Sequence, residues 1–264
     1  MSRDRLANCF ARCKSEKRAA LVGFLTAGDP DVKTSEAAIL TLAAKADIVE
    51  IGMPFSDPMA DGPVIQAASE RALKAGAHTD DVFRIASKVR QQFPEVGIVL
   101  MGYGNTAYAM GFEVFAERAK AAGVDGVLIV DIPPEESAEL DAALKANHLH
   151  SIRLLSPTSS EARLKLGAQS ASGFIYYVSL TGITGADMGE IGSIHEKLQA
   201  IRNYTALPIC VGFGIKSPEQ AANIAEFADG IVIGSHFVRQ LSETGVTAVA
   251  EAAAAMRSAV HLGG

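Results

Sequence analysis

Short apolar runs rich in β-branched residues recur along the chain, and each is followed by a polar turn and a segment with helical spacing. The eight apolar runs cover residues 20–25, 48–51, 97–101, 126–130, 151–155, 174–178, 207–211 and 230–233. Helical spacing of apolar residues covers 32–44, 81–93, 112–122, 137–147, 193–204 and 218–227. Strand and helix therefore alternate, which predicts parallel strands joined by helices.

Most of the predicted strands are apolar at nearly every position, as parallel strands covered on both faces require. Eight such units in about 250 residues predict an α/β fold, the (β/α)8 TIM barrel. We expect an extra N-terminal helix over residues 3–16 and additional helices between the second and third strands. A doubly wound sheet is the alternative, but no G-x-G-x-x-G turn follows the first strand. Residues 1–264 are expected to form a single barrel domain.

Composition narrows the class of protein. Of the 264 residues, 48% are hydrophobic and 20% charged, which argues against a disordered chain. The net charge of −6, without a basic cluster, argues against a nucleic-acid partner. No continuous apolar stretch is long enough for a bilayer, and charges at the amino terminus oppose a secretory signal. With three cysteines and no disulfide framework, the chain is expected to be cytoplasmic.

Active sites of such barrels lie at the carboxyl ends of the strands. Glu50 lies between Val49 and Ile51, so its carboxylate enters an apolar setting whichever face it takes. Burial there would raise its pKa toward the range useful for general acid/base catalysis. The alternative is a structural carboxylate that caps a backbone amide or pairs with a lysine.

The loop after this strand is long and contains Asp57 and Asp61 among prolines and glycine. Its length and its apolar Phe55 and Met59 suggest an active-site lid. Asp61 is a candidate second carboxylate that accepts a hydrogen bond from a substrate N–H. Equally, both aspartates fit an ordinary turn, because Asp before Pro or Gly is common there.

Glycine-rich segments follow three later strands. The loop after residues 174–178 contains Gly182, Gly185 and Gly189, which suits a second lid or a phosphate cradle. Tyr176 and Tyr177 point to opposite sides of their strand, so one faces the barrel axis, although core packing is the more usual role. The segments 211–215 and 231–235 both end strands in glycine, where barrels bind phosphate. A phosphorylated small molecule is therefore the expected substrate.

The sequence lacks the residues expected for Schiff-base or metal-assisted catalysis. The late lysine, Lys216, follows Gly214 near a helix start, so a Schiff-base mechanism is poorly supported. The six histidines and three cysteines form no liganding cluster by spacing, and we expect no metal. Cys9 and Cys13 share a helix face and are interpreted as buried apolar residues.

The stretch over residues 49–66, V-E-I-G-M-P-F-S-D-P-M-A-D-G-P-V-I-Q, closely resembles the signature of the tryptophan synthase alpha chain family. Further similar motifs follow in family order at 24–30, 101–105, 131–134, 179–185, 212–215 and 234–235. The resemblance implies a barrel that cleaves indole-3-glycerol phosphate to indole and glyceraldehyde 3-phosphate. It implies a carbon–carbon lyase without a metal or organic cofactor in this chain.

The resemblance also implies residue roles. Glu50 corresponds to the general acid/base that protonates indole C3, and Asp61 to the carboxylate that binds the indole N–H. The resemblance also implies that Tyr176 is one of the catalytic residues. Phosphate-binding positions are Gly185, Gly214, Gly234 and Ser235, and the indole pocket wall is Phe24, Leu100, Leu128, Tyr176 and Phe213.

A partner is implied as well, the pyridoxal-phosphate-dependent beta chain, in an alpha2beta2 heterotetramer that channels indole. Asp57 and Pro58 of the first lid would touch this partner, and Thr184 of the second lid would contact Asp61 on closure. Leu180 departs from the family, many of whose members carry arginine there, which puts a salt bridge from that position in doubt.

Three rival functions are weaker. The first is a stand-alone lyase with the same chemistry, which strong activity of the isolated chain would favour. The second is a feeble barrel that serves as an activator of the beta chain, although a docking surface needs neither Glu50 nor Asp61. The third is another phosphate-binding barrel, such as a sugar-phosphate isomerase, since fold does not fix function.

Overall fold

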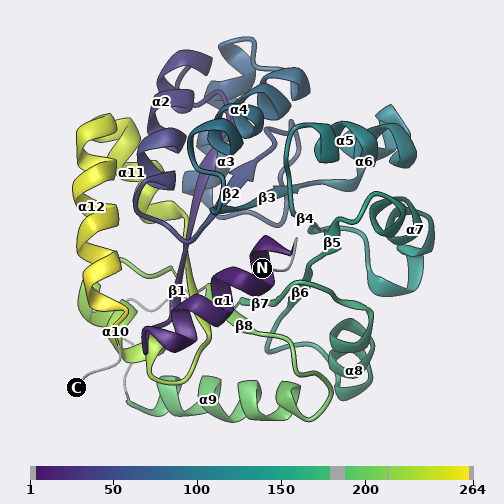
Figure 1. The fold of residues 1–264 in the computed structure, drawn as a ribbon, viewed down its shortest axis with the longest axis vertical. Coiled ribbons are helices and arrows are strands. Elements are labelled where there is room, and N and C mark those ends of the chain that lie inside the picture. The colour runs from purple at the N-terminus through teal and green to yellow at the C-terminus, as the bar shows by residue number, and fades with distance from the viewer. Residues whose placement is uncertain (1–3, 179–187, 213, 262–264) are drawn as a thin grey trace.

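The computed structural model describes residues 4–178, 188–212 and 214–261, which form a barrel of parallel strands surrounded by helices (Figure 1). The strands are β1 (Ala20–Thr26), β2 (Ile48–Gly52), β3 (Gly97–Gly102), β4 (Gly126–Ile129), β5 (His150–Ser151), β6 (Arg153–Leu155), β7 (Ile175–Val178), β8 (Ile209–Gly212) and β9 (Gly230–Ile233). Their order in the sheet is β5-β4-β3-β2-β1-β9-β8-β7-β6. The predicted (β/α)8 fold is confirmed.

The two ends of this order are one strand with an interruption. β5 pairs with β4, and β6 pairs with β7, while only Ile152 separates them. The N–H of Ile152 donates to the carbonyl of Val127 at 2.9 Å, which continues the pairing with β4. Counting β5 and β6 together gives the eight strands that the sequence predicts and closes the barrel.

Helices cover the outside of the sheet, and several connections contain two of them. They are α1 (Arg5–Ser15), α2 (Val32–Ala43), α3 (Pro63–Lys74), α4 (Thr79–Gln92), α5 (Gly104–Met110), α6 (Phe112–Ala121), α7 (Ala138–Ala146), α8 (Glu161–Ser170), α9 (Met188–Arg202), α10 (Pro218–Ala225), α11 (Ser235–Glu243) and α12 (Val246–Ala259), with the short 3-10 helix η1 (Pro134–Glu136). The doubled helix between the second and third strands is α3 with α4. No helix within the described part of the chain has the length and apolar character needed to cross a bilayer.

The expected N-terminal helix is α1, which closes the amino-terminal end of the barrel (Figure 1). Asp4 starts it by accepting a hydrogen bond from the N–H of Ala7 at 3.0 Å. Its buried face carries Leu6, Cys9 and Phe10. These side chains share one apolar cluster with residues that face the barrel interior, namely Val22, Ile48, Val99, Leu128, Ile152, Phe174, Cys210 and Val232.

The interior cluster fixes which strand positions face the active site. Successive side chains of a strand alternate between its faces, so the residue two positions further on faces the interior again, one layer closer to the carboxyl end. Applied to β1 to β4, β6 and β9, this places Phe24, Glu50, Met101, Val130, Leu154 and Gly234 in the upper layer. A second and larger cluster fills the space between the sheet and the helices.

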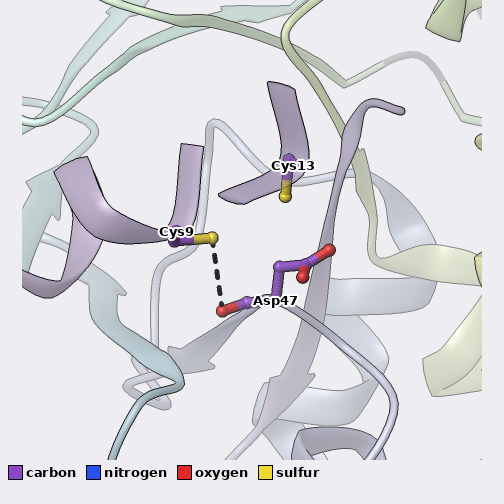
Figure 2. Close-up of side chains that lie close together, drawn as sticks. All are labelled: Cys9, Cys13 and Asp47. Carbon is purple, nitrogen blue, oxygen red and sulfur yellow. Dashed lines mark hydrogen bonds between the residues drawn. The ribbon is translucent and has the colours of Figure 1, made fainter. Parts of the chain in front are cut away.

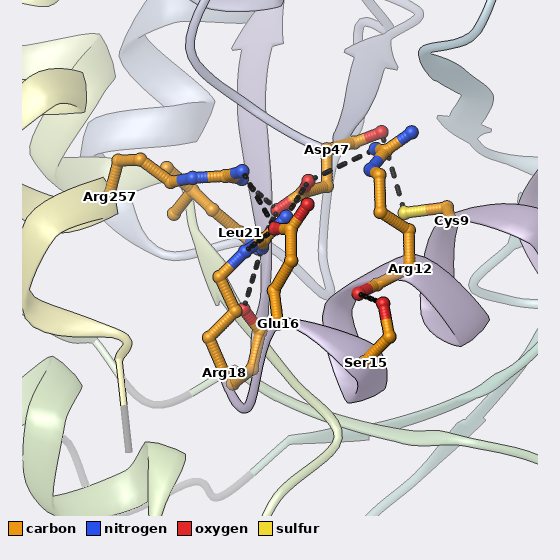
Figure 3. Close-up of polar contacts among 9 residues, drawn as sticks. Cys9, Arg12, Ser15, Glu16, Arg18, Leu21, Asp47 and Arg257 are labelled. Carbon is orange, nitrogen blue, oxygen red and sulfur yellow. Dashed lines mark hydrogen bonds and ion pairs between the residues drawn. The ribbon is translucent and has the colours of Figure 1, made fainter. Parts of the chain in front are cut away.

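A buried carboxylate joins the first and last parts of the chain below the barrel (Figure 3). Asp47, 1% exposed, accepts from Arg18 at 2.7 and 2.9 Å, from Arg12 at 3.2 Å and from Arg257 of α12. The N–H of Leu21 in β1 donates to it at 2.9 Å. Burial opposes ionisation, but these donors outweigh it and hold the pKa of Asp47 at about 2.

Candidate active site

A cavity of about 460 Å³ opens at the carboxyl ends of the strands. Every member of the upper interior layer lines it: Phe24, Glu50, Met101, Val130, Leu154 and Gly234. The loop after β2 contributes Met59 and Asp61 from above, and α3 contributes Ile65. The cavity therefore has an apolar wall with a few polar groups, which is typical of a small-molecule site.

Glu50 is the most perturbed carboxyl group of this cavity. It lies on β2 between its register neighbours Phe24 and Val99, and it is 1% exposed. Neither carboxyl oxygen has a hydrogen-bond partner among the residues that the structure describes. Burial, and then the nearby charge of Asp61, raise the pKa of Glu50 to about 8. The expected apolar setting is confirmed, and neither a backbone amide nor a lysine of the described residues pairs with this carboxyl.

Asp61 lies in the lid loop and is held by a tyrosine. The hydroxyl of Tyr103 donates to Asp61 Oδ2 at 3.1 Å and accepts from the N–H of Ala60 at 3.0 Å. The Tyr103 ring stacks on Phe55 with centroids 5.1 Å apart. Burial raises the pKa of Asp61, and the Tyr103 hydrogen bond opposes that rise. Sequence reasoning did not single out Tyr103, because its position after β3 gives no sign of the loop that it reaches.

Tyr176, rather than Tyr177, is the tyrosine that faces the cavity. Tyr177 is buried in the cluster between sheet and helices. A side chain at Gly212 would place its Cβ 2.5 Å from the Tyr176 hydroxyl, so glycine there gives the ring its space. Burial raises the pKa of Tyr176 well above its ordinary value, and the charge of Glu50 adds to this rise.

The opposite wall combines glycines with a helix N-terminus. Gly214, Gly234 and Ser235 all line the cavity, as the sequence predicts. Gly214 has a φ of 62°, which favours glycine, and Gly234 precedes α11 without a side-chain cap for that helix. Backbone N–H groups and the Ser235 hydroxyl therefore make this wall a candidate anion-binding site.

Two expected pocket residues do not line the cavity. Leu100 faces the opposite side of β3 and packs between sheet and helices, so the prediction for it is wrong. Leu128 faces the barrel interior but lies in the lower layer, among the residues beneath the cavity, so it is not a wall residue either. Met101 and Val130 line the wall instead. Gly185, Phe213, Thr184 and Leu180 lie outside the described residues.

The first lid carries exposed groups beside the cavity. Asp57 is exposed, and its carboxylate accepts from the Ser56 hydroxyl at 2.5 Å. The carbonyl of Pro58 accepts from the N–H of Asp61 at 3.1 Å, which links this exposed turn to the catalytic candidate. Met59 is 82% exposed although it lines the cavity.

One group of potential metal ligands lies far from this cavity, although the sequence predicts none (Figure 2). Candidate ligand atoms of Cys9, Cys13 and Asp47 lie within 4.8 Å of one another, so the expectation that the cysteines join no such group is wrong. The Cys9 thiol points to the Asp47 carbonyl oxygen at 3.7 Å. The neighbouring Cys13 and burial raise the pKa of Cys9. The Asp47 carboxylate already accepts hydrogen bonds from Arg18 and Arg257. A Cys9 thiol that keeps its proton and these neighbouring cations disfavour a metal ion.

Known proteins resemble this chain in sequence over most of its length. The model of one family, described as tryptophan synthase alpha chain, matches residues 10–261. The tryptophan synthase alpha chain of Zymomonas mobilis is 52% identical over 236 residues, 89% of this chain and 86% of the relative. That of Novosphingobium aromaticivorans is 48% identical and covers 97% of both chains.

Solved structures show the same similarity. A Mycobacterium tuberculosis tryptophan synthase structure matches with a TM-score of 0.92 and 34% identity, covering 99% of this chain and 100% of the other. The tryptophan synthase subunit alpha of Legionella pneumophila matches with a TM-score of 0.90 and 36% identity, covering 98% and 99%.

Proposed function

Because the chain belongs to the tryptophan synthase alpha chain family, we propose that Glu50 and Asp61 carry out the lyase reaction of that family here. That reaction, a step of tryptophan biosynthesis, is the retro-aldol cleavage of indole-3-glycerol phosphate to indole and glyceraldehyde 3-phosphate. One observation supports the assignment above all. A carboxyl group whose two oxygens have no partner among residues 4–178, 188–212 and 214–261 faces an apolar cavity and carries a pKa of about 8.

Glu50 moves two protons in this proposal. At neutral pH it is mostly protonated, so it donates a proton to indole C3 and leaves a cationic indoleninium ring. The resulting carboxylate takes the proton of the hydroxyl on the adjacent glycerol carbon, and that carbon becomes the aldehyde. The electrons of the broken carbon–carbon bond return to the ring, which restores aromatic indole. Glu50 ends protonated, as it began.

Asp61 and the glycine wall position the two ends of the substrate. The Asp61 carboxylate accepts the indole N–H and stabilises positive charge as it develops on the ring. Tyr176 and Phe24 flank the ring with Met101 and Val130. The phosphate is held by Gly214, Gly234, Ser235 and the start of α11, with Gly185 as a further contact. Binding energy from this remote phosphate supplies part of the rate acceleration by orientation.

The family works with a beta chain, and we extend the proposal to an alpha2beta2 heterotetramer in which indole passes to that partner. Asp57 and Pro58 are the proposed contacts, since both directly precede the exposed Met59 at the cavity mouth. Thr184 would join Asp61 when the second lid closes. No cofactor is assigned to this chain, and pyridoxal phosphate belongs to the partner. Residues 1–264 are proposed as one barrel domain that works in the cytoplasm.

The decisive experiment compares indole release by wild type, Glu50→Gln and Glu139→Gln, each alone and with a stoichiometric beta chain. Glu139 is exposed on α7, so it controls for loss of a carboxylate elsewhere. We expect Glu50→Gln to abolish release while partner binding survives, and Glu139→Gln to behave as wild type. Unchanged turnover in Glu50→Gln would overturn the assignment.

The same assay separates the rival functions. Weak activity that rises steeply with the partner supports a coupled subunit, whereas high activity that the partner does not change indicates a stand-alone lyase. Absence of indole under both conditions, with binding of simple sugar phosphates, would indicate another phosphate-binding barrel.

A further inference from the structure

A small chamber lies behind Asp61, on the side of the barrel where β1, β2 and β3 end. Its volume is about 10 Å³, and its lining includes Thr26, Ser69, Tyr103 and Asp61 together with Gly52, Gly102 and Met53. A site of this size holds about one water molecule when polar groups surround it. The chamber shares Phe24, Asp61, Ile65 and Met101 with the catalytic cavity, so it adjoins the proposed substrate.

Two hydroxyl groups line this chamber, and within the described part of the chain one of them is buried without a partner. Thr26, the last residue of β1, is 2% exposed, and its Oγ1 has no hydrogen-bond partner among the described residues. Ser69 of α3 is 4% exposed, and no hydrogen bond of its hydroxyl is found within residues 4–178, 188–212 and 214–261. A buried hydroxyl without a partner is costly, so Thr26 Oγ1 indicates a partner inside the chamber, and the Ser69 hydroxyl lies beside the same space.

Asp61 supplies the third polar group. Tyr103 donates to Oδ2 of its carboxylate, and no donor to Oδ1 is found in the described structure. A carboxylate accepts several hydrogen bonds, so Oδ1 has capacity for a further donor. Thr26 and Ser69 come from the barrel and from α3, whereas Asp61 lies on the lid loop. A bridge between them would join the lid to the barrel.

We propose that one ordered water in this chamber bridges Thr26 and Ser69 to the Asp61 carboxylate and thereby positions Asp61 to accept the indole N–H. Thr26 and Ser69 are then positioning residues, because they act on the substrate only through Asp61. This inference rests on the proposed role of Asp61. The water takes hydrogen bonds from or gives them to three protein groups, the number typical of a buried water.

The bridge restricts the carboxylate on two sides. Tyr103, the residue after β3, fixes Oδ2, and the water fixes Oδ1 from β1 and α3. A carboxylate held in this way loses little conformational entropy when it accepts the indole N–H. Part of the entropic cost of ordering Asp61 is therefore met before the substrate binds. Loss of either hydroxyl leaves the water with fewer partners and lets Asp61 rotate.

The test uses Thr26→Val, Thr26→Ser and Ser69→Ala in the full chain with its beta chain, with crystal structures and steady-state indole release. Valine matches the shape of threonine without the hydroxyl, and serine keeps the hydroxyl. We expect Thr26→Val to lower kcat/KM roughly tenfold, the size of one hydrogen bond to a charged group. Thr26→Ser is expected to restore most of it. Density for the water is expected in wild type and not in Thr26→Val.

The same variants in an Asp61→Asn background show whether the effect passes through Asp61. We expect Thr26→Val to change kcat/KM little there, because its route to the substrate is already lost. Unchanged kcat/KM in both Thr26→Val and Ser69→Ala, or a chamber without water density, would overturn the inference and leave the role of Asp61 intact. Unchanged turnover of Asp61→Asn itself would instead overturn the proposed function. If Thr26→Val does not fold, Ser69→Ala decides the same question.

Discussion

The raised pKa of Glu50 predicts how both stability and activity depend on pH. A carboxyl group whose folded pKa is raised is neutral in both states at low pH. Stability is lost as the pH rises from the unfolded pKa to the folded pKa, because over this range the unfolded state is ionised and the folded state is not. The pKa is about 8 against an ordinary 4.5. At about 1.4 kcal/mol for each pH unit between them, the ionised folded state is destabilised by about 5 kcal/mol.

The measurement is the free energy of unfolding of wild type and Glu50→Gln, taken by urea titration at intervals from pH 5 to pH 9. Other titrating groups contribute to both proteins, so their difference isolates Glu50. We expect Glu50→Gln to gain stability relative to wild type as the pH rises through this range, by an amount on the order of 5 kcal/mol. The gain should level off above pH 8, where Glu50 is ionised in both the folded and the unfolded wild type.

Activity supplies the second readout. For wild type, kcat/KM for indole release is expected to stay level near pH 7 and to fall about tenfold per pH unit well above pH 8, because the free enzyme must carry the Glu50 proton. The substrate phosphate ionises near pH 6 and therefore affects only the acid side. A stability difference that does not vary with pH, or a kcat/KM that stays level through pH 10, would refute the reasoning.

Three further substitutions test other contacts. Tyr103→Phe removes a donor to Asp61 and is expected to lower kcat/KM roughly five- to tenfold with little change in melting temperature; an unchanged kcat/KM would show that this hydrogen bond does not matter. Gly212→Ala places a methyl group against Tyr176, so indole release should fall sharply while urea titration shows a loss of about 1–3 kcal/mol, and full activity would contradict the crowding. Asp47→Asn leaves the buried Arg18 without this carboxylate and is expected to cost about 3–5 kcal/mol by urea titration. Because the pKa of Asp47 is lowered, wild type should lose this contribution as the pH falls from about 4 through 2, and the variant should not; a parallel acid profile would argue against it.

The barrel and its main catalytic candidate could be predicted from sequence because both follow from local pattern. Repeated apolar runs specify parallel strands, and a lone carboxylate inside such a run must be buried. Leu100 shows the limit of this reasoning. It neighbours Met101 on one strand, and only the register with Glu50 and Val99 reveals which of the two faces the cavity. A shift of one residue moves a side chain to the other face of the sheet.

Contacts between distant segments were beyond the sequence. Tyr103 meets Asp61 across 42 residues, and Arg257 meets Asp47 across 210. The local sequence around each of these residues does not indicate which distant residue it contacts. Thr26 is similar, because a threonine at a strand end is ordinary until the structure shows that its buried hydroxyl has no partner in the part of the chain described.

The pairing of β1 with β9 has a consequence for a chain that is still being made on the ribosome. β1 is complete after residue 26, but its neighbour spans Gly230–Ile233 and the arginine that joins α12 to Asp47 comes later still. Throughout most of translation β1 therefore presents an open, apolar edge. Such edges pair with other chains, so the emerging polypeptide is most exposed to aggregation and to chaperone binding until its last quarter leaves the exit tunnel.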